Sequence, residues 1–283
     1  MFDLTLEYIL LIIAASVIAG IIGSMAGLGG GVLIVPFLSL YFRVPISLAI
    51  GASIISVIAT SSGSASAYVR DKISNIRVGT FLVLFTTSGA ILGAFLERIA
   101  PRNIIFLTFG IVLLISVLPL IRKIGQVVPE NVKNDTISEK LSLNSHFHSA
   151  ELDREVEYNV TGTKSGSAMM LVAGVLSGLL GIGSGVFKVI AMDTFMKLPI
   201  KVSTTTSNFM IGMTAAASAG IYFFNGDVNP FIAAPVATGV LIGAIVGSRL
   251  LLKTKSSTIR VLFGVIIVVV AVEMLLNGVG IRV

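Results

Sequence analysis

The sequence predicts an all-α polytopic membrane protein made of two inverted repeats, each with about five membrane-entering helices. Three observations lead to this fold class: an unusually apolar composition, a repeat at one fixed spacing, and an uneven distribution of basic residues. The chain has 283 residues, of which 55% are hydrophobic and only 12% are charged. Soluble domains carry about 25% charged residues, so a chain this apolar must have lipid as its solvent.

The composition also excludes several classes of protein. The absence of cysteine rules out disulfides, iron–sulfur clusters, thiolate metal sites and cysteine nucleophiles. A formal charge of +6 would suit nucleic-acid binding in a soluble protein, but in a membrane protein basic residues mostly record topology. We therefore expect a multi-pass protein of the cell (plasma or inner) membrane, with no nucleic-acid partner and no cofactor.

An internal repeat divides the chain into two transmembrane parts. A shift of 154 residues aligns the halves without a gap over about a hundred positions. The matches include Gly27, Gly29 and Gly31 with Gly181, Gly183 and Gly185, Pro45 with Pro199, Ser53 with Ser207, and Thr60 with Thr214. We therefore expect a first repeat over residues 1–121, a polar linker over 122–165, and a second repeat over 166–283.

Each half contains one long interrupted apolar stretch, followed by three ordinary spans. A membrane-spanning helix needs about 20 apolar residues, so the interrupted stretches are too long for one crossing and short for two full ones. The interrupted stretches are residues 7–42 and 166–196, and the ordinary spans are 45–68, 78–96, 103–121, 200–223, 228–248 and 257–277.

The basic residues decide how the interrupted stretches lie. If each stretch crosses once, the basic residues of the loops divide ten against nine between the two sides. If each enters and returns as a Gly-broken helical hairpin, they divide fifteen against four, which the positive-inside rule favours. The second arrangement inverts one repeat relative to the other. It predicts extracytoplasmic termini and a cytoplasmic 122–165 linker.

The two glycine-rich turns are the first candidate substrate-binding elements. Non-helical backbone at membrane depth is tolerated only where protein or a water-filled cavity satisfies it, and a helix that restarts there presents free N–H groups and a positive dipole end. Two such helix starts facing one another would bind an anion. The candidate residues are Gly27, Gly29, Gly30 and Gly31 in the first turn, and Gly181, Gly183, Ser184 and Gly185 in the second. The alternative is tight helix packing, which suffices for Gly89, Gly93, Gly243 and Gly247.

Polar side chains in the apolar segments are the second group of candidates. Ser53, Ser207 and Asn208 carry hydroxyl or amide donors that suit an oxyanion, although such side chains often bond to their own backbone instead. Lys188 is a basic residue inside an apolar segment, and an intramembrane charge is a functional hypothesis by default. It is a counter-charge for an anion, a partner of Asp193, or a side chain that snorkels to the cytoplasmic interface.

The linker contains two histidines, His146 and His148, that are two positions apart. Histidine is a common metal ligand, but two histidines in a solvated loop are more often simply solvated. We therefore expect no metal site in this protein.

The motif Gly-Leu-Gly-Gly-Gly-Val-Leu-Ile-Val-Pro at 27–36, with Pro45, Gly51-Ala52-Ser53 and a degenerate second copy, resembles the TauE/SafE family of sulfite and organosulfonate exporters. The resemblance covers nearly the whole chain except the 122–165 linker. It implies passage of small sulfur-containing anions such as sulfite, thiosulfate or organosulfonates. The second copy departs from the pattern, because Ser184 and Ile190 stand where the first has Gly30 and Pro36. These departures bear on the identity of the cargo.

Taken together, the residues and the resemblance predict a secondary transporter that works by alternating access, with its site near the midplane between the two Gly-broken helices. The expected partners are a small anionic substrate and the lipid bilayer, with a coupling proton or ion as a further candidate. No nucleotide-binding motif is present, so the energy comes from a gradient or the membrane potential. Two alternatives remain open, an anion channel and a carrier of another small carboxylate or oxyanion. An intramembrane enzyme is not expected.

The predicted topology can be tested by cysteine accessibility, because the chain has no cysteine of its own. Gly226→Cys should react with an impermeant maleimide added from outside, and Lys140→Cys should react only after the membrane is permeabilised. The opposite labelling pattern would rule out the inverted arrangement.

Overall fold

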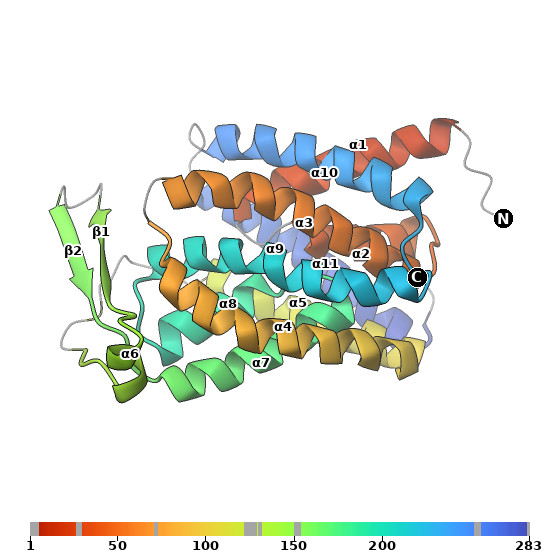
Figure 1. Cartoon of the computed structure of the whole chain (residues 1–283). Coiled ribbons are helices and arrows are strands. Elements are labelled where there is room, and N and C mark those ends of the chain that lie inside the picture. Colours follow the sequence, from red (N-terminus) through yellow and green to blue (C-terminus); the bar gives the residue numbers. More distant parts are fainter. Residues whose placement is uncertain are drawn as a thin grey trace.

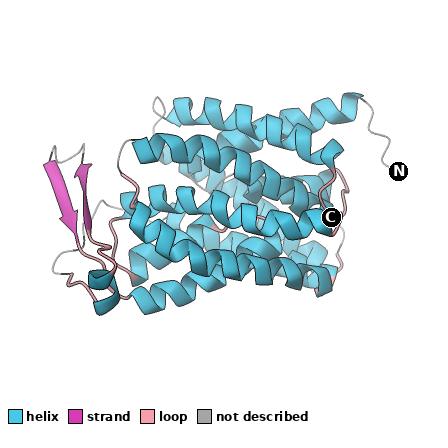
Figure 2. Ribbon diagram, viewed as in Figure 1, coloured by secondary structure: helices cyan, strands magenta, loops and turns pink. Residues whose placement is uncertain are grey.

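The computed structural model describes residues 6–26, 30–70, 73–121, 129, 132–149, 154–251 and 256–281. Within these residues the chain is helical apart from one two-stranded β-hairpin (Figure 2). The elements of the first half are α1 (Leu6–Ala26), α2 (Gly31–Pro36), the π-helical segment η1 (Phe37–Tyr41), α3 (Ile46–Arg70), α4 (Ile76–Ile99) and α5 (Arg102–Ile121). The linker holds α6 (Thr136–Lys140), β1 (Ser145–Ser149) and β2 (Arg154–Tyr158). The second half holds α7 (Thr163–Leu180), α8 (Gly185–Ile190), η2 (Ala191–Phe195), α9 (Ile200–Phe224), α10 (Pro230–Leu251) and α11 (Ser256–Gly278).

The helices have the length and the exposed apolar surface of a membrane protein. Four of them are long and apolar enough to cross a bilayer, over Leu6–Gly23, Ile76–Ile99, Thr163–Leu180 and Pro230–Gly247. Large apolar side chains face outward, among them Phe224 and Phe231, which are 90% and 70% exposed. Such a surface is stable in lipid and not in water. The prediction of an all-α multi-pass membrane protein is confirmed.

Corresponding helices recur at the spacing that the sequence predicts. Elements α2, η1 and α3 begin at residues 31, 37 and 46, and α8, η2 and α9 begin at residues 185, 191 and 200, each 154 residues later. The correspondence is looser at α7, which begins at Thr163, inside the segment assigned to the linker. The side chains of Asp135 and Thr163 explain the earlier start, because Asp135 Oδ2 accepts hydrogen bonds from Thr163 N and Thr163 Oγ1 at 2.7 and 2.6 Å.

The most extensive contacts between helices join the first half of the chain to the second. Helix α1 packs along α10, and α4 packs along α7. Helices α3 and α9 pack together in the middle of the bundle, where α3 also contacts α10 and α9 also contacts α4. Helix α5 packs against α11. Figure 1 shows these helices running along one common direction, with the linker elements at one end of the bundle. Neither half can therefore bury its helices without the other.

Glycines allow the α4–α7 and α1–α10 pairs to approach closely. A Cβ atom added to Gly89 of α4 would overlap the carbonyl oxygen of Leu171 in α7. Gly243 occupies the corresponding position in α10, where an added Cβ would overlap the carbonyl oxygen of Val17 in α1. Small residues bring membrane helices close enough for backbone-to-backbone packing. The packing role predicted for Gly89 and Gly243 is confirmed.

The linker folds into a small module, which its polar composition did not reveal. Strands β1 and β2 pair antiparallel, with Phe147 opposite Val156 and Ser145 opposite Tyr158. Alternation along the strands buries Phe147, Val156 and Tyr158, because successive strand residues point to opposite faces. These side chains join Leu143 and Val160 in a cluster with apolar residues of α4, α7, η2 and α9. The module therefore packs onto the end of one helix group.

The close packing of α4 on α7 can be tested with a matched pair of glycine variants. Gly89→Ala should lower the free energy of unfolding by about 1–3 kcal/mol, because the added methyl overlaps backbone that cannot move independently. Thermal unfolding in detergent measures this. Gly220→Ala in α9 is the control, since a Cβ at that position meets nothing within 4 Å. Equal stability of the two variants would contradict the proposed close contact.

Candidate functional site

The second glycine turn is a buried break between α7 and α8. Helix α7 ends at Leu180, and the backbone becomes left-handed at Gly181, Gly183 and Ser184, with φ of 66°, 70° and 45°. Glycine adopts such angles without strain, whereas serine normally avoids them. A hydrogen bond of 2.5 Å from Ser184 Oγ to the carbonyl oxygen of Ala173 holds the serine in place. The departure from the glycine pattern at Ser184 thus ties the turn to α7.

The first turn of α8 leaves backbone donors without partners. Lys188 N bonds to the carbonyl oxygen of Ser184 at 3.2 Å, closing the first helical ring. The N–H groups of Gly185, Val186 and Phe187 have no acceptor among the residues that the structure describes. All three residues are buried, and buried N–H groups are nearly always paired with protein, water or a ligand. These N–H groups could therefore donate hydrogen bonds to a small anion.

The first turn lies partly outside the described residues. Gly27 and Gly29 belong to the segment that is not described, so their predicted roles stay predictions. Gly30 is the N-cap of α2, with a right-handed φ of −61°. Gly31 is closely surrounded, because an added Cβ would lie 2.7 Å from Ser53 Oγ and 3.0 Å from the carbonyl oxygen of Gly181. The first turn thus meets the second turn at Gly31.

Ser53 and Ser207 hold backbone carbonyls of the two turns. Ser53 Oγ lies 2.7 Å from the carbonyl oxygen of Gly181 and 3.3 Å from that of Gly31. Ser207 Oγ, at the corresponding position of the second half, lies 3.1 Å from the carbonyl oxygen of Gly185. Both hydroxyls therefore donate to the protein in this conformation. Their contacts position the turns, and direct binding of an anion by either serine stays a prediction.

Lys188 is completely buried and points into the helix bundle. Its exposed fraction is 0%, and its Nζ lies 3.0 Å from Thr214 Oγ1. Side chains on a helix lean toward its N-terminus, which carries the ammonium back toward the turn rather than out to an interface. No ion pair joins Lys188 to Asp193 or to any other residue that the structure describes. The two alternatives of snorkelling and pairing with Asp193 are therefore wrong for this conformation.

Two threonines from different helices complete the surroundings of the ammonium group. Thr214 Oγ1 lies 3.1 Å from Thr86 Oγ1 and 2.8 Å from the carbonyl oxygen of Met210. Thr86 and Thr214 are both 0% exposed. An ammonium group has three donors, and one of them is used by the residues that the structure describes. We call Lys188, Thr214 and Thr86 the buried lysine cluster.

Thr86 was not among the sequence candidates. Its position in the repeat corresponds to Val240, so the 154-residue comparison gave no polar signal there. Asn208, which was a candidate, is 7% exposed, and its side chain has no hydrogen-bond partner in the described part of the chain. Its amide is therefore available to a ligand or to water.

The linker histidines do not form a metal centre in the described part of the chain. Strand β1 carries His146, whose Nε2 lies 3.9 Å from Glu155 Oε2 on the exposed face of the hairpin. The side chain of His148 lies outside the described residues. No group of three or more histidine, cysteine or carboxylate residues comes together among the residues described.

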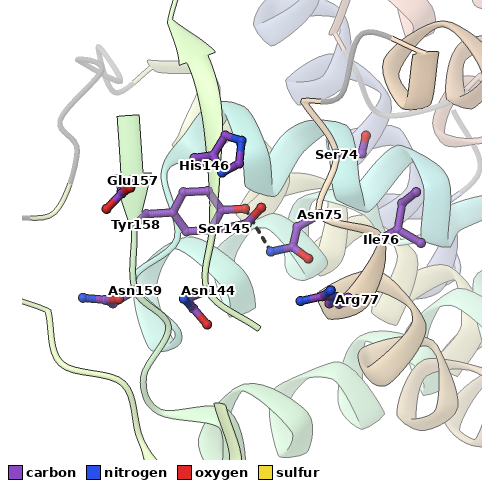
Figure 3. Close-up of a pocket in the computed structure, with 10 residues that line it drawn as sticks. All are labelled: Ser74, Asn75, Ile76, Arg77, Asn144, Ser145, His146, Glu157, Tyr158 and Asn159. Atoms are coloured by element: carbon purple, nitrogen blue, oxygen red, sulfur yellow. Dashed lines mark hydrogen bonds between the residues drawn. The ribbon is translucent and has the colours of Figure 1, made fainter. Parts of the chain in front are cut away.

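Two cavities open toward the ends of the helix bundle. One of about 270 Å³ lies opposite the linker and is lined by Ser47, Glu97, Arg98, Asn225 and Asp227, with Arg102 and apolar neighbours. Burial raises the pKa of Asp227 in the α9–α10 loop, and the nearby Arg98 opposes that rise. The other, of about 660 Å³, lies between the linker module and the start of α4 (Figure 3). Neither is lined by the buried lysine cluster, which is closed in this conformation.

Comparisons with known proteins agree on one class. The sequence matches the family model described as sulfite exporter TauE/SafE over residues 12–274. It is 28% identical over 277 residues to the probable membrane transporter protein YunE of Bacillus subtilis, covering 95% of this chain and 98% of that protein. It is 29% identical over 242 residues to the probable membrane transporter protein YdhB of the same organism, covering 85% and 89%. The probable membrane transporter protein MJ0441 of Methanocaldococcus jannaschii is 26% identical over 298 residues, covering 96% and 98%. No solved structure matches the chain.

A double-mutant cycle can test the contact within the buried lysine cluster. Thr214→Val should lower the free energy of unfolding by about 1–3 kcal/mol, because it leaves the buried ammonium without an acceptor. In a Lys188→Met background the same change should cost much less, since methionine needs no acceptor. Chemical unfolding in detergent gives both values.

The control for this cycle is Ser218→Ala, which removes another buried hydroxyl of α9 that bonds to the carbonyl oxygen of Ala215. Its effect on the free energy of unfolding should be the same with or without the Lys188→Met change, within about 0.5 kcal/mol, because Ser218 and Lys188 bond to different partners among the described residues. An additive result for Thr214→Val as well would count against the contact between Lys188 and Thr214.

Proposed function

Because the chain belongs to the sulfite exporter TauE/SafE family, we propose that this membrane transporter moves a small sulfur-containing anion: sulfite, thiosulfate or an organosulfonate. The proposal is of a secondary transporter that works by alternating access. The single observation that carries the anionic part is Lys188, a fully buried ammonium with one hydrogen-bond partner and no described ion pair. Burying an unpaired charge is costly, and a bound anion removes that cost.

The proposed binding site lies between the second turn and the buried lysine cluster. The unpaired amides of Gly185, Val186 and Phe187 offer neutral donors, and Lys188 offers a positive charge. Asn208 offers a further amide. Oxyanions with several equivalent oxygens suit a site of convergent donors with a single charge. The first turn contributes through Gly31, which lies against Gly181.

The proposal includes two inverted repeats, and the helix packing supports it. In the repeat, α1 corresponds to α7 and α4 corresponds to α10. The α1–α10 pair of one half-to-half contact therefore corresponds to the α7–α4 pair of the other. The bond from Ser53 to the carbonyl oxygen of Gly31 recurs as the bond from Ser207 to that of Gly185. Repeats related in this way place a transporter's binding site at the boundary between them.

The proposal also includes a Gly-broken helical hairpin at the start of each repeat. In the first half, Tyr8 Oη bonds to the carbonyl oxygen of Phe42 at 2.9 Å, so the start of α1 lies beside the end of η1. In the second half, Thr161 N bonds to the carbonyl oxygen of Met196 at 3.2 Å, just before α7 and just after η2. These contacts support the proposal that each interrupted apolar stretch enters the membrane and returns to the side from which it entered.

In the proposed cycle, two helix groups move relative to one another. One contains α1, α2, α3 and α10, and the other contains α4, α7, α8 and α9; they meet where α3 packs on α9. The bond from Ser53 to the carbonyl oxygen of Gly181 crosses this boundary, and it would break when the boundary opens. A bound anion would favour one position through its contacts with Lys188, which is how a ligand shifts such an equilibrium.

The orientation in the membrane belongs to the proposal. The linker module lies at one end of the bundle, and the end of α11 near the C-terminus lies at the other (Figure 1). We assign the linker end to the cytoplasm because fifteen of the nineteen basic loop residues fall on that side of the proposed topology.

Transport in proteoliposomes tests the role of the lysine. Lys188→Met should abolish uptake of labelled sulfite or thiosulfate, because the charge that binds the anion is lost while the volume is kept. Lys164→Met is the control, since Lys164 is an exposed lysine of α7, and its transport should match the unchanged protein. Full transport by correctly folded Lys188→Met would refute the proposed site.

Counterflow distinguishes a carrier from an anion channel. Unlabelled anion inside the vesicles should drive accumulation of labelled anion, because a carrier exchanges the two across one site. A channel gives no such accumulation. Gly183→Val should abolish counterflow, since valine is strained at a φ of 70° and an added Cβ would lie 2.9 Å from Ile211.

A further inference from the structure

The larger cavity lies where the linker module meets the helix bundle. Its walls come from the α3–α4 loop with the start of α4, and from the β-hairpin (Figure 3). The first wall contributes Ser74, Asn75 and Arg77, and the second contributes Ser145 and Tyr158 among others. Nine of the ten lining residues have a side chain with a polar atom, and Ile76 is the exception.

Asn75 bonds to residues of both walls of this cavity and to α9. Its Nδ2 donates hydrogen bonds to Tyr158 Oη at 2.9 Å and to the carbonyl oxygen of Leu143 at 2.8 Å. Its Oδ1 accepts from Val78 N and so caps α4. Its backbone N donates to Thr206 Oγ1 of α9 at 2.9 Å. Asn75 therefore fastens the linker module to both α4 and α9.

The floor of the cavity adjoins the part of α9 that carries the proposed anion site. Thr206 is bonded to Asn75, and the next two residues of α9 are Ser207 and Asn208. We take Asn75, which lines the cavity, with Thr206 and Val78 behind it, as the floor. Thr206 and Val78 are both 0% exposed, so the floor is closed. The cavity and the proposed site are thus separated by the contact between the starts of α4 and α9, the helices that Asn75 holds together.

We infer that this cavity is the vestibule through which the anion reaches its site from the linker side, and that the linker module is its gate. The inference rests on the proposed function for the identity of what passes. We call the Asn75–Tyr158 bond the latch: together with the Asn75–Leu143 bond and the apolar cluster, it holds the module against the starts of α4 and α9. Release of the module lets the starts of α4 and α9 separate, and this opens the floor of the cavity above Asn208.

The energetics suit a latch that can open. The Tyr158 hydroxyl keeps its proton at neutral pH, because burial raises the pKa of Tyr158 even though hydrogen bonds with Asn75 and Ser145 oppose the rise. The latch is therefore a neutral hydrogen bond, worth about a tenfold change in an equilibrium. The linker has no counterpart elsewhere in the 154-residue repeat, so the gate acts on one helix group only. This asymmetry distinguishes the linker end from the opposite end.

The gate is tested with a reporter thiol, since the chain has no cysteine. In Asn208→Cys protein, the rate of modification by an impermeant maleimide added to the linker side of vesicles measures how often the floor opens. Tyr158→Phe removes only the latch hydroxyl and keeps the buried ring, so we expect the modification rate to rise by roughly tenfold. The assay requires no transported substrate.

Tyr8→Phe in the same Asn208→Cys background is the matched control. Tyr8 also makes one hydroxyl bond, to the carbonyl oxygen of Phe42, but the start of α1 lies at the end of the bundle opposite the linker module (Figure 1). We expect its labelling rate to equal that of the parent. An unchanged rate in Tyr158→Phe, or an equal rise in both variants, would overturn the gate. Failure of sulfite transport with a positive labelling result would instead count against the proposed function alone.

Discussion

Backbone hydrogen bonding at membrane depth is the constraint on which the rest of this structure depends. Lipid offers no partner to a free N–H or carbonyl group, so every break in a helix must be satisfied by another segment. The break after Leu180 meets this demand through Ser53, which bonds to the carbonyl oxygen of Gly181, and through Ser184, which bonds to that of Ala173. The N–H groups at the start of α8 are the exception, because they have no acceptor in the part of the chain that the structure describes. An exception to so strict a rule is where a ligand is expected.

The two halves share equivalent serine contacts, whereas the buried lysine occurs in the second half alone among the residues compared. Ser53 and Ser207 occupy equivalent positions and make equivalent contacts to the two turns. Lys188 has no such equivalent, since Ile34 stands at the matching position of the first half. The lysine of α8 therefore has no charged counterpart in α2. Two buried ammonium groups close together would repel one another, and the isoleucine at position 34 avoids that repulsion.

The same asymmetry extends to the surface of the bundle. The linker module packs on α4, α7, η2 and α9, the group of elements that surrounds Lys188. Its contacts run through Asn75 to Thr206, close in sequence to the polar residues of α9. The module and the charge thus belong to one helix group. In the proposed cycle, motion of that group against α3 and its neighbours would change access to the lysine and keep its bond to Thr214.

The sequence by itself determined the membrane class, the repeat spacing and the approximate ends of the helices, and it singled out Lys188 as a candidate. Hydropathy, glycine clusters and charge bias are properties of local segments, so they can be read without knowing which helices touch. Only the tertiary structure decided that α4 pairs with α7, that Thr86 joins the lysine cluster, and that the polar linker folds against the bundle. Thr86 and Thr214 are 128 residues apart. A contact over that separation depends on how whole helices pack, which no local pattern records.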